Sequence, residues 1–191
     1  GTRLVVNSQS KVIYPRCFKG DIRKIYAQGE VFLEVAHDKK HPFIVESDDF
    51  KLQVLGTKFN ISNYKGGTTN IVLVEGAVEV TDKNEKKARL NPNDLLNIAN
   101  GTIAYQKQVD VAEYISWVEG IMLLNGNDLS QIIQRLSIYY GISIQCDPII
   151  GKEKVYGKLD LKDDIDEVIE CIQQTLPFTI EKSDTSIYLN K

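Results

Sequence analysis

The sequence predicts two domains of different class, an all-β domain followed by a small α+β domain. Residues 4–106 form a series of short runs rich in Val, Ile, Phe and Tyr, with Gly, Asn and Asp between them. Apolar residues at helical spacing begin only after Asp110. Beyond Gly120 the chain repeats itself with a period of 36 residues.

The N-terminal region, residues 1–107, is predicted to be all-β. In residues 30–36 the side chains of Val31, Leu33 and Val35 share one face, which is typical of a strand with one face in a core. The predicted strands lie at residues 4–6, 11–14, 23–27, 30–36, 43–46, 50–55, 58–63, 70–75 and 77–81. Further turns are predicted at residues 91–94 and at Asn100-Gly101. Such a density of short strands indicates a sandwich, a roll or a short solenoid-like fold.

Residues 108–120 are predicted to form a linker helix. Asp110 and Glu113 have the spacing of a capping box, and apolar residues follow at helical spacing. The helix carries Trp117 and is expected to end near Gly120.

Residues 121–191 are predicted to be an α+β domain built from two βαβ repeats. The period of 36 residues places Asp128 on Asp164 and Leu136 on Ile172. Each copy has the pattern of a strand, an acidic N-cap, an amphipathic helix and a second strand. Each helix is expected to lie on one side of a small sheet and to leave sheet edges open.

Charge is distributed unevenly between the two regions. The chain has 23 basic and 26 acidic residues, a net charge of −3, which argues against broad electrostatic binding to nucleic acid or anionic lipid but leaves room for a local basic patch. Residues 1–107 have 16 basic and 12 acidic residues, net +4, and residues 108–191 have 7 and 14, net −7. The acidic second region is either a solvated surface or a means of steering toward a basic partner.

No pattern of an enzyme, a cofactor site or a metal site is found. His37 and His41 are the only histidines, and two lysines lie between them, so they are interpreted as part of a charged turn. There is no GxSxG motif and no phosphate-binding loop. We therefore predict no catalytic residue, no cofactor and no metal ligand.

The three cysteines do not indicate a disulfide scaffold. Cys17, Cys146 and Cys171 are an odd number without a CxxC pair. Cys146 continues an apolar alternation and is interpreted as a small buried side chain. A bridge between Cys146 and Cys171 is the alternative.

Several ordered motifs resemble the FecR family of transmembrane anti-sigma regulators, in its Bacteroidetes form. The motifs are Asn7-Ser8-Gln9-Ser10, Tyr14-Pro15, Phe18-Lys19-Gly20, Gly29-Glu30 with residues 31–36, Pro42-Phe43, residues 54–60, residues 74–78, Leu90-Asn91-Pro92 and residues 117–120. The duplicated tail is similar to the short N-terminal domain of secretins and TonB-dependent receptors. The resemblance covers essentially the whole chain.

The resemblance implies a periplasmic region tethered to the inner membrane. It implies a membrane helix and a cytoplasmic anti-sigma region N-terminal to these residues, which would control an extracytoplasmic-function sigma factor. The implied partner is the signalling domain of an outer-membrane TonB-dependent receptor. Neither nucleic acid nor, apart from the tether, a membrane is expected as a partner.

An open sheet edge in the C-terminal domain is the expected docking site, because an edge strand can accept a strand from a partner. The residues expected to contribute to partner binding are Tyr156, Lys158, Asp160, Ile187, Tyr188 and Leu189. Ordinary sheet packing is the other interpretation of these residues.

A glycan-binding β module is the alternative function. Tyrosines of the first domain could stack on sugars, and this function requires them to cluster at a cleft. The candidates are Tyr14, Tyr26, Tyr64 and Tyr105.

Overall fold

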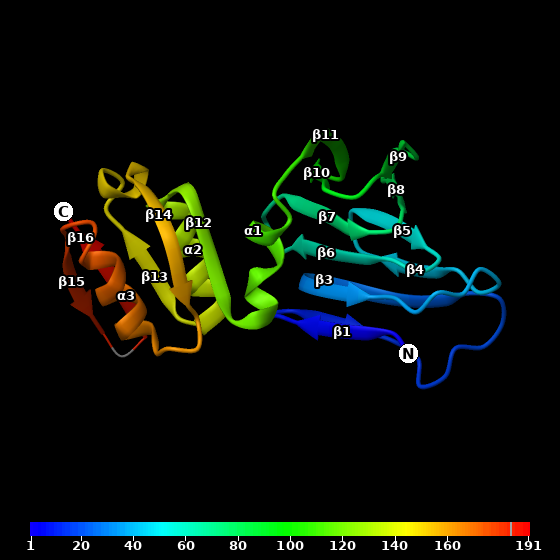
Figure 1. Ribbon diagram of the computed structural model, residues 1–191, viewed down its shortest axis with the longest axis horizontal. Coiled ribbons are helices and arrows are strands. Elements are labelled where there is room, and N and C mark those ends of the chain that lie inside the picture. Colours follow the sequence, from blue (N-terminus) through cyan, green and yellow to red (C-terminus); the bar gives the residue numbers. More distant parts are fainter. Residues whose placement is uncertain (184) are drawn as a thin grey trace. The chain divides into compact units, whose positions relative to one another are not determined.

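The computed structural model describes residues 1–183 and 185–191, which form two compact units, Gly1–Tyr114 and Ile115–Lys191 (Figure 1). Unit 1 contains β1 (Arg3–Val6), β2 (Lys11–Ile13), β3 (Arg23–Glu34), β4 (Phe43–Glu46), β5 (Phe50–Val54), β6 (Lys58–Asn63), β7 (Thr69–Glu75), β8 (Val78–Asp82), β9 (Lys87–Leu90), β10 (Asp94–Ala99) and β11 (Thr102–Gln108). Helix α1 (Ala112–Ile115) and the 3-10 helix η1 (Ser116–Glu119) follow, so the predicted linker helix is two short helical turns.

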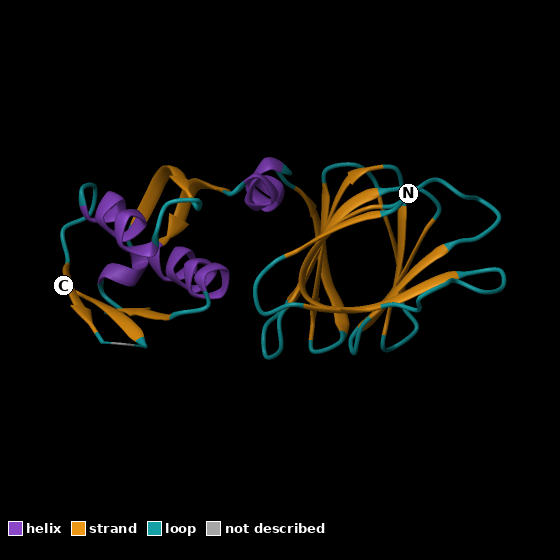
Figure 2. Ribbon diagram, turned by 90° about the horizontal axis from the view of Figure 1, so that it is seen from below, coloured by secondary structure: helices purple, strands orange, loops and turns teal. Residues whose placement is uncertain are grey.

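Unit 1 is a β-sandwich whose two layers share the long strand β3. The second half of β3 pairs with β6 and β1, and from there the order is β7, β10 and β11. The first half of β3 pairs with β2 and lies parallel to β4, and from there the order is β5, β8 and β9. The strands curve around a common interior (Figure 2). The predicted all-β class is confirmed.

Alternate side chains of the strands fill this interior. In β5, Phe50, Leu52 and Val54 are buried while Lys51 and Gln53 are exposed. Phe43 and Phe59 are among the largest fully buried side chains, and each stabilises the fold by roughly 1.5–3 kcal/mol through the removal of apolar surface from water.

The residues Gly29 and Glu30 mark the point where β3 passes from one layer to the other. Gly29 has φ +91°, and a Cβ atom there would lie 2.4 Å from the Ser10 Oγ atom, so the approach of the two chains requires glycine. The Glu30 N–H donates to Ser10 Oγ at 2.9 Å, and the Glu30 carboxylate accepts from Asn7 Nδ2 at 2.8 Å and Asn60 Nδ2 at 3.0 Å. Glu30 is therefore held by hydrogen bonds from two other segments of unit 1, the turn after β1 and strand β6.

Unit 2 is the smaller α+β region, as predicted. Its elements are β12 (Ile121–Asp128), α2 (Leu129–Tyr140), β13 (Ser143–Cys146), the 3-10 helix η2 (Ile150–Lys152), β14 (Lys154–Asp160), α3 (Ile165–Gln173), β15 (Thr179–Lys182) and β16 (Ser186–Asn190). Each repeat supplies a strand, a helix and a second strand, and β16 follows the second repeat.

The two strands of each repeat lie in different sheets. β12 pairs antiparallel with β14, while β16 pairs parallel with β13 and antiparallel with β15. The helices lie between these two sheets (Figure 2). Helix α2 does not lie against a single sheet, as the sequence led us to expect. Its four buried positions, Leu129, Ile132, Ile133 and Leu136, form a wide apolar stripe that contacts both β12 and β13.

The acidic N-cap is confirmed for α3 and not for α2. The Asp164 carboxylate accepts hydrogen bonds from the N–H groups of Asp166 and Glu167, both at 3.0 Å. Asp128 has the N-cap position of α2 but its side chain makes no cap hydrogen bond; its Oδ1 lies 3.0 Å from Lys154 Nζ. The cross-strand ion pair replaces the cap there.

Candidate docking edge

The sheet of β12 and β14 has one apolar face and one exposed face. Met122 and Leu124 of β12 and Val155 and Leu159 of β14 are buried. The side chains of Tyr156, Lys158 and Asp160 are all exposed, on the opposite face of β14. The alternation that buries one set against the helices thus leaves the three predicted residues of this strand accessible.

The main-chain groups of these three residues point away from β12. At one end of the ladder the Leu161 N–H donates to the Gly120 carbonyl at 2.8 Å, and at the other end the Leu129 N–H donates to the Glu153 carbonyl at 2.9 Å. Residues of an antiparallel strand alternate between bonding to the partner strand and pointing outward. Counting from either end gives the same outward set: Lys154, Tyr156, Lys158 and Asp160.

We call the outer edge of β14, with these four residues, the docking edge. Within the described residues β14 pairs with β12 only, so the outward N–H and C=O groups are not used by another strand. An edge of this kind can pair with a strand from another protein. Lys154 was not predicted, although its position two residues before Tyr156 places it in the same alternation.

Tyr156 is the largest exposed side chain of the docking edge, at 69% exposure. Its ring lies over Gly126, where an added Cβ atom would be 2.9 Å from the tyrosine hydroxyl oxygen. Gly126 has φ +75° and lies in a bulge between Asn125 and Asn127. The Tyr156 ring therefore lies against the glycine of the bulge, while most of its surface is exposed to solvent.

The prediction that Ile187, Tyr188 and Leu189 lie at an open edge is wrong. They belong to β16, which is the central strand of its sheet and is paired on both sides. Ile187 and Leu189 are buried, and Tyr188 is 36% exposed. The edges of that sheet are β13 and β15 because the last strand of the chain inserts between them, an order that no local sequence pattern encodes.

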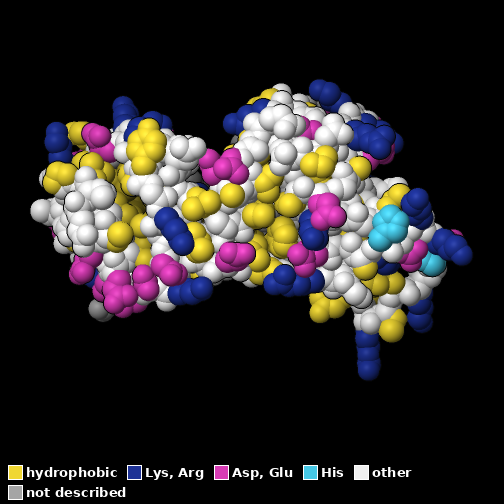
Figure 3. All heavy atoms as spheres, in the orientation of Figure 1, with side chains coloured by type: hydrophobic (Ala, Val, Ile, Leu, Met, Phe, Trp, Pro, Cys, Tyr) yellow, Lys and Arg dark blue, Asp and Glu magenta, His cyan; other side chains and the backbone are white. Residues whose placement is uncertain are grey.

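Acidic residues follow the docking edge where β14 turns into α3. Asp160, Asp163, Asp164, Asp166 and Glu167 lie within eight residues of one another, and we call this segment the acidic turn. Figure 3 shows acidic side chains gathered in this part of the molecule. Asp166 pairs with Lys182 at 2.5 Å. The electrostatic potential is therefore negative at one end of the docking edge.

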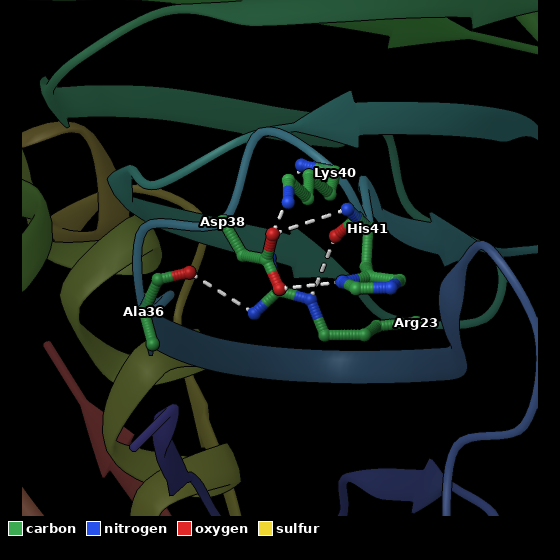
Figure 4. Close-up of polar contacts among 5 residues, drawn as sticks. All are labelled: Arg23, Ala36, Asp38, Lys40 and His41. Atoms are coloured by element: carbon green, nitrogen blue, oxygen red, sulfur yellow. Dashed lines mark hydrogen bonds and ion pairs between the residues drawn. The ribbon is translucent and has the colours of Figure 1, made fainter.

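His41 belongs to a hydrogen-bonded clasp in unit 1 (Figure 4). Its Nδ1 lies 2.7 Å from Asp38 Oδ2, and this hydrogen bond lowers the pKa of Asp38 below its ordinary value. Arg23 holds the same loop: Nε donates to the His41 carbonyl at 2.9 Å and Nη1 to the Ala36 carbonyl at 3.0 Å. Among the described residues there is no group of three or more side chains suited to a metal ion.

The remaining candidates are dispersed. All three cysteines are free thiols, so the alternative of a bridge between Cys146 and Cys171 is wrong. The Tyr26 hydroxyl donates to Asp48 at 3.0 Å, and the Tyr64 hydroxyl to the Ser8 carbonyl at 3.1 Å, with burial raising the pKa of Tyr64 to about 12. A hollow of about 400 Å³ beside β5 and β8 is lined mainly by charged residues and by no tyrosine. The arrangement expected of a glycan site is not found there.

Comparison with known proteins assigns the family. The model of the FecR protein family matches residues 1–79, and that of the FecR C-terminal domain matches residues 121–189. Two crystal structures of a candidate anti-sigma factor from Parabacteroides distasonis are 30% identical to this chain, with TM-scores of 0.84 and 0.83. They match 100% of this chain and 91% and 90% of their own lengths. No curated protein matches the chain.

These matches define a signal-transducing regulator. The chain belongs to the FecR family of anti-sigma regulators, and the resemblance seen in the sequence is confirmed. Within the described residues no helix is long and apolar enough to cross a membrane.

Proposed function

We propose that this chain is the periplasmic region of an inner-membrane-tethered anti-sigma regulator, and that unit 2 binds the signalling domain of an outer-membrane TonB-dependent receptor. Binding changes the control that a cytoplasmic region of the same protein exerts on an extracytoplasmic-function sigma factor. The observation that carries the proposal is the docking edge, whose main-chain groups and side chains face outward together.

A strand added to the docking edge would use both kinds of group. The N–H and C=O groups of Tyr156 and Lys158 supply affinity through a new ladder, while their side chains supply specificity. A tyrosine at the middle of such a contact contributes large, rigid apolar area at low entropic cost.

The acidic turn supports a basic partner surface. Residues 108–191 carry a net charge of −7, and the acidic turn begins at Asp160, the last residue of the docking edge. Complementary charge raises the association rate and makes it depend on salt. The partner segment is therefore expected to be an extended strand with basic residues beside it.

A pull-down and a binding titration test the proposal, with the N-terminal signalling domain of the TonB-dependent receptor from the same genomic neighbourhood as the probe. Tyr156→Ser is expected to weaken binding by about tenfold or more, as for an interface tyrosine. Lys158→Pro removes an outward N–H and leaves the bonds to β12 in place, so it is expected to weaken binding while unit 2 stays folded.

Tyr188→Ser is the matched control, because Tyr188 is a partly exposed tyrosine of the same unit on a strand paired on both sides. Equal loss in Tyr156→Ser and Tyr188→Ser would contradict docking at this edge. Binding to sugars on a glycan array without binding to the receptor domain would favour the alternative function instead.

A further inference from the structure

The segment between β2 and β3 exposes an unusual amount of apolar surface. Ile13 at the end of β2 is 52% exposed, and Tyr14, Phe18 and Ile22 in the β2–β3 loop (Tyr14–Ile22) are 67%, 42% and 44% exposed. Single exposed apolar residues are ordinary, but four within ten residues form a patch that calls for a ligand or a partner.

The same segment carries the positive charge of its region. Residues 11–24 contain five basic residues, Lys11, Arg16, Lys19, Arg23 and Lys24, and one acidic residue, Asp21, a net charge of +4. Residues 1–107 as a whole also have a net charge of +4, so the other 93 residues, with 11 basic and 11 acidic, are neutral. The charge is therefore concentrated next to the apolar patch.

Contacts with the core hold the loop in place. The rings of Phe18 and the buried Phe43 pack edge to face, with their centroids 6.3 Å apart. The Arg23 Cζ atom lies over the Phe43 ring, 5.4 Å from its centroid. The Phe18 side chain is thus anchored on the core of unit 1, and Arg23 anchors the end of the segment beside it. Figure 1 locates the β2–β3 loop. Figure 3, in the same orientation, shows hydrophobic and basic side chains next to one another in that region.

Of the five basic side chains of residues 11–24, only Lys24 forms an ion pair with a described acidic residue. The Lys24 Nζ atom lies 2.6 Å from the Glu46 carboxylate. The Arg23 guanidinium donates to the main-chain carbonyl of His41. Lys11, Arg16 and Lys19 have no ion pair with any described residue. Their charges remain available to an external anion.

We propose that the β2–β3 loop docks on an anionic lipid bilayer surface, with Tyr14, Phe18 and Ile22 at the level of the headgroups and Arg16 and Lys19 on the lipid phosphates. Aromatic and aliphatic side chains flanked by lysine and arginine are the combination that the membrane interface favours. The net charge of −3 of the whole chain opposes nonspecific adsorption, so attachment is confined to this loop.

Vesicle co-sedimentation of the whole chain tests the inference. The probes are vesicles of phosphatidylcholine with and without anionic phosphatidylglycerol, at low and at high salt. We expect binding to the anionic vesicles that salt weakens. Arg16→Gln with Lys19→Gln should reduce partitioning by about 25-fold, at roughly fivefold for each cation. Tyr14→Ser, at a side chain that is 67% exposed, should reduce partitioning by about tenfold.

Two matched controls distinguish an effect of the β2–β3 loop from a general effect of removing positive charge or an exposed tyrosine. Lys65→Gln with Lys86→Gln removes the same charge elsewhere in unit 1, and Tyr105→Ser removes another exposed tyrosine; both should bind as the parent chain does. Absence of binding to anionic vesicles, or equal losses in the controls, would overturn the inference. So would sedimentation showing a vesicle-free dimer that Arg16→Gln with Lys19→Gln dissociates, because the loop would then bind a second copy.

Discussion

The crossing of β3 between the two layers of unit 1 can be tested by Gly29→Ala. At φ +91° an alanine pays a conformational cost of about 1–2 kcal/mol. Its Cβ atom would also lie 2.4 Å from Ser10 Oγ and 2.6 Å from Ser10 Cα, so the backbone around Ser10 must move. Ser10 Oγ then no longer accepts from the Glu30 N–H, which costs about a further 1–3 kcal/mol.

The sum is about 2–5 kcal/mol, a large part of the roughly 5–15 kcal/mol that stabilises an ordinary domain. For a unit of this size we expect the melting temperature to fall by about 10 °C or more. Far-UV circular dichroism during heating and urea unfolding measures it. Gly20→Ala is the control, because Gly20 also has a positive φ, +84°, but nothing lies within 4 Å of its added Cβ atom. Equal destabilisation by the two substitutions would refute the role assigned to the contact with Ser10.

Three further predictions concern other polar contacts. The hydrogen bond from the Ile103 N–H is the chief cause that lowers the pKa of Asp82 in the folded protein. The ionised Asp82 carboxylate therefore stabilises the fold at pH values above its pKa in the unfolded chain, about 3.9. This stabilisation is lost as the pH falls through the lower pKa of the folded protein. Urea unfolding should therefore show Asp82→Asn to be less stable at neutral pH and less sensitive than the parent chain to acid below about pH 4. In thermal unfolding of unit 2, Asp164→Ala should cost about 1 kcal/mol, and Asp128→Ala less, since it loses an exposed ion pair only; the reverse order would contradict the cap assignment. Tyr140→Phe should cost about 1 kcal/mol by the same measurement, because the single hydroxyl proton of Tyr140 is shared between the carbonyls of Asp163 and Leu161, at 2.9 and 3.2 Å. No loss of stability would show this shared hydrogen bond to be dispensable.

Features encoded by adjacent residues could be predicted from the sequence. Asn100-Gly101 joins β10 to β11, and both residues have the positive φ, 51° and 74°, that a tight hairpin turn requires. The sharing of β3 between two layers could not be predicted, because its parallel pairing with β4 depends on contacts across some twenty residues of chain.

The candidate docking edge was predictable in part for the same reason. The alternation of β14 places Tyr156, Lys158 and Asp160 on one exposed face, and a two-residue period is visible in the sequence. Whether a strand lies at an edge depends on the order of strands in the sheet. The alternation of β16 is equally clear, yet β16 lies at the centre of its sheet because this last strand inserts between β13 and β15.

Because β3 belongs to both layers, a cut in the backbone has different effects at different places. A protease nick within Tyr14–Ile22 leaves β3 whole, and the short N-terminal fragment stays bound through β1 and β2, which both pair with it. A nick at Gly29 divides the strand that both layers share and interrupts the hydrogen-bonded continuity between them. The β2–β3 loop is accordingly the place where unit 1 can be split into complementing fragments or joined to another protein without loss of its architecture.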